Sequence, residues 1–148
     1  MTPSPLLICY DGSEGARRAV GAAATLLVER TAVILAVAAP TTAVQALDTL
    51  GAVPQAPEEV NLETAVRSAE EGADYARRAG LTAEARGELA APTWKGIVDV
   101  ADELDAAVIV IGSRGLKGVR ELVEGSLSHE VAEHTGRPVL IVPPGGRY

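Results

Sequence analysis

Short apolar segments alternate with segments of helical periodicity along the whole chain, and this alternation restricts the fold more than any other feature. The apolar segments are typical of strands and run over Leu6–Tyr10, Ala32–Ala38, Leu81–Gly87, Ala106–Ile111 and Val139–Val142. Strands that alternate with helices, and that are too apolar for a sheet with one wet face, indicate a parallel sheet with helices on both faces. We therefore predict an α/β fold of order β-α-β-α-β-α-β-α-β.

The segments between these strands carry apolar residues at helical spacing. The predicted helices run over about 14–30, 58–79, 92–104 and 126–134. Leu81–Gly87 alternates apolar and polar residues, which predicts a strand at the edge of the sheet. Segment 40–57 leaves the carboxyl end of the second strand, and its composition favours a covering loop over a linker. A length of 148 residues predicts one domain over 1–148.

The composition excludes several classes of protein. One Cys excludes an internal disulfide and a thiolate zinc site, and Cys9 within an apolar strand is interpreted as an inert buried thiol. A net charge of −7 argues against general binding of nucleic acid or anionic membrane. The N-terminus has neither a signal peptide pattern nor an apolar run of spanning length, so we expect a cytoplasmic protein.

A glycine pattern follows the fourth predicted strand, at the edge of the sheet where such folds bind ligands. Gly112 and Gly115 are followed by nine residues and then by Gly125 and Ser126, which open the last helix. Glycines allow backbone amides to approach a ligand, and a helix N-terminus attracts anions. Tight turns alone would explain the glycines, and a helix cap alone would explain Ser126. The occurrence of both at the same edge of the sheet favours an anion site.

The loop within this pattern is basic although the chain is acidic. Arg114, Lys117 and Arg120 precede its first acidic residue, as several linked phosphates would require. The pattern is not a Walker A loop, because no Gly-Lys-Ser/Thr follows the glycines. It is not the dinucleotide fingerprint either, because Asp11-Gly12-Ser13 follows the first strand.

With this spacing the sequence resembles the universal stress proteins, whose ATP-binding branch carries G-x2-G-x9-G-[S/T]. The chain also resembles this family near both ends, at Asp11-Gly12-Ser13 and at the closing strand Pro138–Val142. The resemblance implies a three-layer Rossmann-like fold (adenine nucleotide alpha hydrolase-like) with a five-stranded parallel sheet of order 3-2-1-4-5. It also implies an ATP site at the carboxyl edge of the sheet.

The resemblance also implies which residues would surround each part of the ATP molecule. The phosphates would lie around Gly112, Arg114, Gly115, Gly125, Ser126, Leu127 and Ser128. The adenosine end would lie near Cys9, Tyr10, Asp11, Val37 and Ile111. Asp11 could accept hydrogen bonds from the ribose hydroxyls or face a bound Mg²⁺. Because aromatic residues make up only 3% of the chain, we expect backbone groups and aliphatic contacts to read the base.

The preferred hypothesis is an ATP-binding regulatory protein in which nucleotide orders the loop Leu116–Glu124 and alters a surface for an unidentified protein partner. The alternative is a slow ATPase or phosphotransfer enzyme using Asp11 and Mg²⁺. No catalytic residue is assigned, since His129 and His134 fall on different faces of a helix. A receiver-like signalling domain is disfavoured, because no acidic pair ends the first strand.

The last strand, Val139–Val142, predicts a homodimer. It is uninterrupted and apolar, and at a sheet edge it would leave backbone groups unpaired unless a second copy covered them. The family resemblance implies the same dimer.

Overall fold

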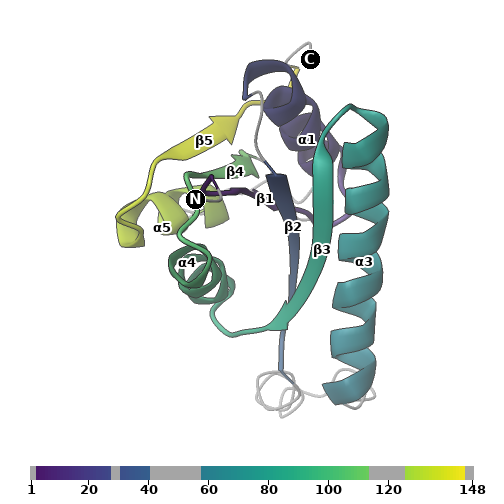
Figure 1. Ribbon diagram of the computed structural model, residues 1–148. Coiled ribbons are helices and arrows are strands. Elements are labelled where there is room, and N and C mark those ends of the chain that lie inside the picture. The colour runs from purple at the N-terminus through teal and green to yellow at the C-terminus, as the bar shows by residue number, and fades with distance from the viewer. Residues whose placement is uncertain (1–2, 28–30, 41–57, 114–125, 146–148) are drawn as a thin grey trace.

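The computed structural model describes residues 3–27, 31–40, 58–113 and 126–145 (Figure 1). Its elements are β1 (Leu6–Cys9), α1 (Glu14–Leu26), β2 (Thr31–Ala38), α3 (Glu58–Arg78), β3 (Thr82–Leu89), α4 (Thr93–Glu103), β4 (Val108–Gly112), α5 (Leu127–His134) and β5 (Val139–Val142). The strands form one parallel sheet of order β3-β2-β1-β4-β5. This confirms the predicted α/β fold and strand order.

Several element boundaries differ from the sequence prediction by one or two residues, and the end of α1 differs by four. β3 continues past Gly87 to Leu89, because it pairs with β2 along its whole length, up to Ala38 opposite Leu89. α1 ends at Leu26, with Leu27 as its C-cap, instead of continuing to Arg30. The covering loop predicted over 40–57 lies outside the described residues, except for Pro40.

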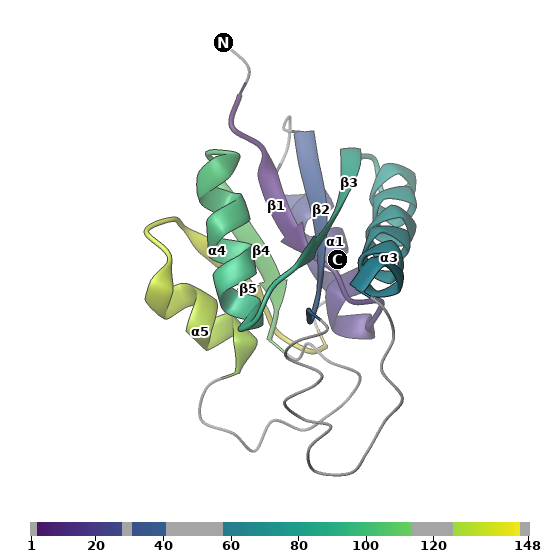
Figure 2. The same cartoon turned by 90° about the horizontal axis from the view of Figure 1, so that it is seen from below.

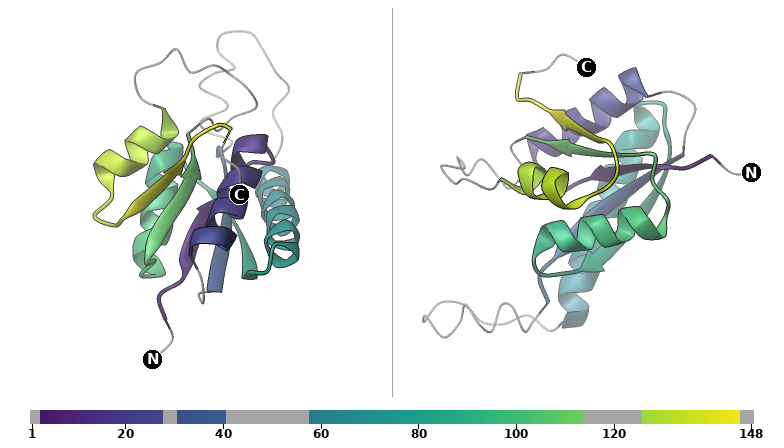
Figure 3. Two further views of the ribbon diagram at one scale, coloured as in Figure 1. Left: turned by 90° about the horizontal axis from the view of Figure 1, so that it is seen from above. Right: turned by 90° about the vertical axis from the view of Figure 1, so that its left-hand side faces the viewer.

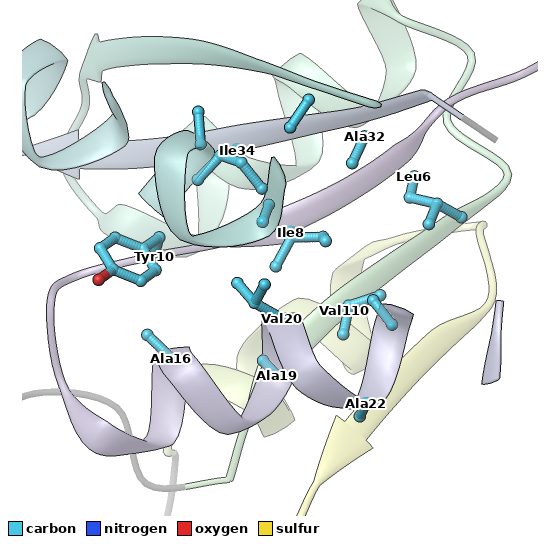
Figure 4. Packing of buried hydrophobic residues seen from close by; sticks show 14 of the residues in the cluster. Leu6, Ile8, Tyr10, Ala16, Ala19, Val20, Ala22, Ala32, Ile34 and Val110 are labelled. Carbon is cyan, nitrogen blue, oxygen red and sulfur yellow. The ribbon is translucent and has the colours of Figure 1, made fainter. Parts of the chain in front are cut away.

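Helices cover both faces of the sheet, α1 and α3 on one and α4 and α5 on the other (Figure 2 and Figure 3). Successive side chains of β1 point to opposite faces of the sheet and so contribute to both apolar layers. Leu6 and Ile8 face α1, whereas Leu7 belongs to the layer under α4. All three side chains are fully buried. Figure 4 shows the first layer, in which Ala19 and Ala22 of α1 lie over the strands. Small side chains therefore let the helix approach the sheet closely. Within the described ranges, no helix combines the length and apolarity that crossing a membrane requires.

Arg137, in the connection between α5 and β5, binds the connection between α4 and β4 at the amino edge of the sheet. Its Nε donates to Asp102 Oδ1, and its Nη1 donates to Asp105 Oδ1 and to the Ala106 carbonyl, each at 2.9 Å. Asp105 adopts a left-handed backbone conformation (φ 50°) between α4 and β4. The guanidinium holds the pKa of the Asp105 carboxyl below its usual value, first by this hydrogen bond and then by its charge.

We expect Arg137→Leu to lower the free energy of unfolding by about 1–2 kcal/mol, because charge-assisted hydrogen bonds are lost and a backbone carbonyl loses its donor. Urea unfolding at pH 7 measures the loss. The difference from wild type should shrink as the pH falls below about 4, where the lowered pKa of Asp105 no longer favours the folded state. A difference that stayed constant down to pH 2 would contradict the assignment of the loss to these ion pairs.

Candidate functional site

A pocket lies at the carboxyl edge of the sheet, where β1, β2 and β4 end. It has an open volume of about 550 Å³, which includes space continuous with the solvent. Its lining is mostly aliphatic. The lining residues are Cys9, Tyr10, Asp11, Ser13, Ala16, Leu35, Val37, Thr93, Ile97, Ile111, Gly112 and Leu127. The structure thus brings together seven residues that the sequence predicts for the site: Cys9, Tyr10, Asp11, Val37, Ile111, Gly112 and Leu127.

The backbone of Val37 points from β2 toward this pocket. Tyr10 N donates to Leu35 O at 2.9 Å, and Ala90 N donates to Ala38 O at 3.0 Å. Successive residues of β2 therefore direct their backbone groups alternately to β1 and to β3, and those of Val37 point to the β1 side. Because β1 ends at Cys9, the Val37 N–H and C=O have no hydrogen-bond partner among the described residues. A ligand edge with one donor and one acceptor would satisfy both groups.

Asp11 and Ser13 shape the turn between β1 and α1. Ser13 N donates to Asp11 Oδ1 at 2.9 Å, and Ala16 N donates to Ser13 Oγ at 3.1 Å. Gly12 has a φ of 83°, which L side chains rarely adopt. Ser13 is therefore the N-cap of α1, and the Asp11 carboxylate is held at the rim of the pocket.

Tyr10 is buried, with 3% of its surface exposed, and its hydroxyl donates to Glu71 Oε1 of α3 at 2.9 Å. Burial, and then this hydrogen bond, raises the pKa of the Tyr10 hydroxyl. Gly72 of α3 lies against the ring, since a Cβ at Gly72 would lie 2.7 Å from Tyr10 Cγ. Because its hydroxyl is engaged with α3, Tyr10 supports the pocket wall mainly through its ring.

Gly112 lies against the first turn of α1. A Cβ at Gly112 would come within 2.8 Å of the Gly15 carbonyl oxygen. This contact is between backbones, so a side chain could not be accommodated by a rotamer change. The first glycine of the motif therefore has a packing role in addition to any role near phosphates.

Leu127 of α5 lines the pocket, while the serines on either side of it interact with each other. Ser128 is buried, and the Ser126 and Ser128 Oγ atoms are 3.1 Å apart. The Ser126 side chain makes no capping hydrogen bond to α5. Arg114, Gly115 and Gly125 lie outside the described residues, as does the loop Leu116–Glu124.

Three helices begin at the pocket: α1 at Ser13 and Ala16, α4 at Thr93, and α5 at Leu127. The positive ends of their dipoles favour an anionic ligand there, despite the net charge of the chain. The sequence prediction missed five lining residues, namely Ser13, Ala16, Leu35, Thr93 and Ile97. Two signals could have found some of them: Leu35 shares the strand face of Val37, and Thr93 follows the Pro92 that opens α4.

Cys9 is partly buried in the pocket wall, where burial, and then the charge of Asp11, raises the pKa of its thiol from 9.0 to about 12. At pH 8 we therefore expect Cys9 to react with iodoacetamide at least about a hundredfold more slowly in the folded chain than in urea, because only the thiolate reacts. Mass spectrometry of timed samples measures both rates. Similar rates would contradict the inert role assigned to this thiol.

The described residues offer no cluster of three or more His, Cys, Asp or Glu side chains that could hold a metal ion. His134 stacks on Trp94 of α4, with ring centroids 3.8 Å apart, and its Nδ1 lies 2.7 Å from the Glu130 carbonyl oxygen. The ring stack joins α5 to α4, and the contact with Glu130 lies within α5, so His134 has a structural role.

A family model described as the Universal stress protein family matches residues 4–143. Universal stress protein YxiE of Bacillus subtilis (strain 168) is 32% identical over 143 residues, which are 93% of this chain and 97% of that protein. A universal stress protein solved in complex with cAMP is 25% identical, with a TM-score of 0.67, over 97% of this chain and 98% of that chain. The universal stress protein from Archaeoglobus fulgidus in complex with dAMP shares the fold, with 22% identity and a TM-score of 0.70 over 96% of this chain and 99% of that chain. The chain therefore belongs to the universal stress protein family.

Proposed function

We propose that this chain is an ATP-binding regulatory protein whose nucleotide lies in the pocket at the carboxyl edge of the sheet. The observation that carries the proposal is the pair of Val37 backbone groups that point into an aliphatic pocket without a partner among the described residues. Adenine offers an amino donor beside a ring nitrogen acceptor, and this pair is complementary to one N–H and one C=O on the same strand edge.

The remaining walls suit the rest of an adenosine. Leu35, Ile97 and Ile111 supply aliphatic contact for the faces of the base. Asp11 at the rim is placed to accept from ribose hydroxyls. A relative of 25% identity was solved with cAMP, itself an adenine nucleotide, which supports this class of ligand.

The phosphates are proposed to lie toward α5 and the glycine motif. Gly112 and Leu127 line the pocket. Of the other motif residues, Arg114 and Gly115 follow Gly112 in the sequence, and Gly125 and Ser126 precede Leu127. In this proposal, bound nucleotide orders the loop Leu116–Glu124 and so changes a surface that a partner protein recognises. The charge of Arg114, Lys117 and Arg120 would favour a triphosphate over a monophosphate.

A magnesium ion fits the site only as part of the nucleotide complex. Asp11 would contribute one carboxylate and the phosphates the other ligands, which is how Mg²⁺ is commonly held. The ion would neutralise phosphate charge, and it would also permit the alternative activity, slow ATP hydrolysis or phosphotransfer. If the rate of ATP turnover per amount of protein persists through purification and is lost in Asp11→Ala, that result would favour the alternative.

Equilibrium dialysis with ATP tests the proposal. Gly125→Asp places a carboxylate where the motif implies phosphate, so we expect the affinity for ATP to fall at least about tenfold through charge repulsion. Gly136→Asp is the matched control, because it adds the same charge where a Cβ meets no atom within 4 Å. Undiminished binding by Gly125→Asp would contradict the placement of the phosphates.

We also propose that the chain forms a two-fold homodimer through β5. Ile109 N donates to Pro138 O and Ser113 N donates to Val142 O, so the backbone groups of Val139 and Ile141 point away from β4. β5 is an edge strand, and pairing with a second copy would satisfy these groups. Light scattering at micromolar concentration should give twice the monomer mass, whereas a monomer mass would refute the dimer.

A further inference from the structure

β3, at the opposite edge of the sheet from β5, has a row of outward-facing backbone groups. The bond from Ala90 N to Ala38 O shows that even-numbered residues of β3 pair with β2, so odd-numbered residues point outward. Arg77 confirms this direction, because its Nε and Nη2 donate to the Ala83 carbonyl at 3.1 and 2.8 Å. The outward groups of Ala85, Gly87 and Leu89 have no partner among the described residues.

The two faces beside this open edge differ in character. On one face α3 presents two large apolar side chains, Leu62 and Val66, that are 40% and 37% exposed. They lie one helical turn apart, and Val66 packs directly over β3, since a Cβ at Gly87 would lie 2.6 Å from Val66 N. An extended segment added to the edge would place alternate side chains on this apolar strip.

On the other face a groove lies between β3 and α4, with an open volume of about 460 Å³ that includes space continuous with the solvent. It is lined by Arg86, Glu88, Leu89, Ala90, Gly96, Asp99, Val100 and Glu103, which carry three carboxylates and one guanidinium. Arg86 is shared by Glu88 at 2.7 Å and Glu103, and Lys95 pairs with Asp99 at 2.8 Å, so an excess of one negative charge remains beside Glu88 and Glu103. The intervening side chains of an added segment would enter this acidic groove, which suits Lys or Arg.

We propose that the outer edge of β3 binds an extended peptide segment of a partner protein in which apolar and basic residues alternate. The backbone of the segment pairs with Ala85, Gly87 and Leu89, its apolar side chains cover Leu62 and Val66, and its basic side chains enter the groove beside Glu88 and Glu103. A second copy of β3 is a poorer occupant, because its side chains on the groove face would add Glu84 and Glu88 against one Arg86. This site lies outside the nucleotide pocket and does not depend on it.

Fluorescence anisotropy of the full chain with a labelled, acetylated and amidated (Lys-Val)₄ peptide tests the proposal. We expect saturable binding that the corresponding (Glu-Val)₄ peptide does not show. E88Q/E103Q should weaken (Lys-Val)₄ binding about fivefold, because two attractive charges are removed. The control E14Q/E133Q makes the same change in net charge at exposed positions of α1 and α5, away from β3, and should stay within about twofold of wild type.

Amide chemical shifts decide whether the backbone pairs as proposed. Addition of (Lys-Val)₄ should move the N–H signals of Ala85, Gly87 and Leu89 more than those of Arg86 and Glu88, which pair with β2. Absent binding, equal binding by E88Q/E103Q, or shifts centred elsewhere would overturn the proposal. Slow hydrogen exchange of the three outward amides before peptide is added would also overturn it, since another segment or a second copy would then already cover the edge.

Discussion

Val37→Pro is expected to bind ATP at least about tenfold more weakly than the wild-type chain. Proline removes the N–H of residue 37, which points from β2 toward the pocket. The ring nitrogen of adenine then loses the protein donor proposed for it. The pairing between β2 and β3 should survive, because Val37 does not donate to β3. Equilibrium dialysis with labelled ATP measures the change.

Val37→Ile is the matched control for this experiment, since it keeps the N–H and an aliphatic side chain. It should bind ATP within about threefold of wild type, because apolar exchanges of similar volume have small effects. Thermal unfolding must show that both variants remain folded. If folded Val37→Pro binds ATP as tightly as Val37→Ile, the backbone of Val37 does not read the base.

Gly112→Ala is expected to lower the free energy of unfolding by about 2–3 kcal/mol, an overpacking cost. Its Cβ would lie 2.8 Å from the Gly15 carbonyl oxygen, and both partners belong to the backbone, so β4 or α1 must shift. Urea unfolding monitored by Trp94 fluorescence measures the loss.

Gly136→Ala is the control for Gly112→Ala, because its Cβ would meet nothing within 4 Å and its φ is not positive. We expect it to leave stability unchanged or to raise it by up to about 1 kcal/mol by restricting the unfolded chain. Equal effects of the two substitutions would show that the contact with Gly15 is not tight in solution.

The fold follows from the sequence because apolar runs such as Val108–Ile111 alternate with helical segments, a pattern that favours a parallel sheet covered by helices on both faces. Strand ends were harder to predict, since they depend on the neighbouring strand. Gly87 looks like the end of a strand, yet β3 continues to Leu89 because β2 extends equally far. The tight packing of Val66 over Gly87 explains why a glycine stands within the strand.

The candidate site was predictable only in part, for a physical reason. Residues that end strands, such as Asp11 and Val37, can be placed from the order of the elements, because all parallel strands end at one edge. Ile97 and Ala16 reach the pocket from helices, and their positions depend on how each helix lies over the sheet. The direction of the Val37 backbone groups follows from register, which a single sequence does not specify.

Isothermal titration of the wild-type chain with ATP and with GTP tests the central claim most directly. The account predicts one ATP site per chain and GTP binding at least about tenfold weaker, because guanine exchanges the donor and acceptor positions that adenine offers to Val37. Saturable binding of ATP with this preference would support an adenine nucleotide pocket at the carboxyl edge of the sheet. No ATP binding at millimolar concentration, or equal affinity for GTP, would contradict it.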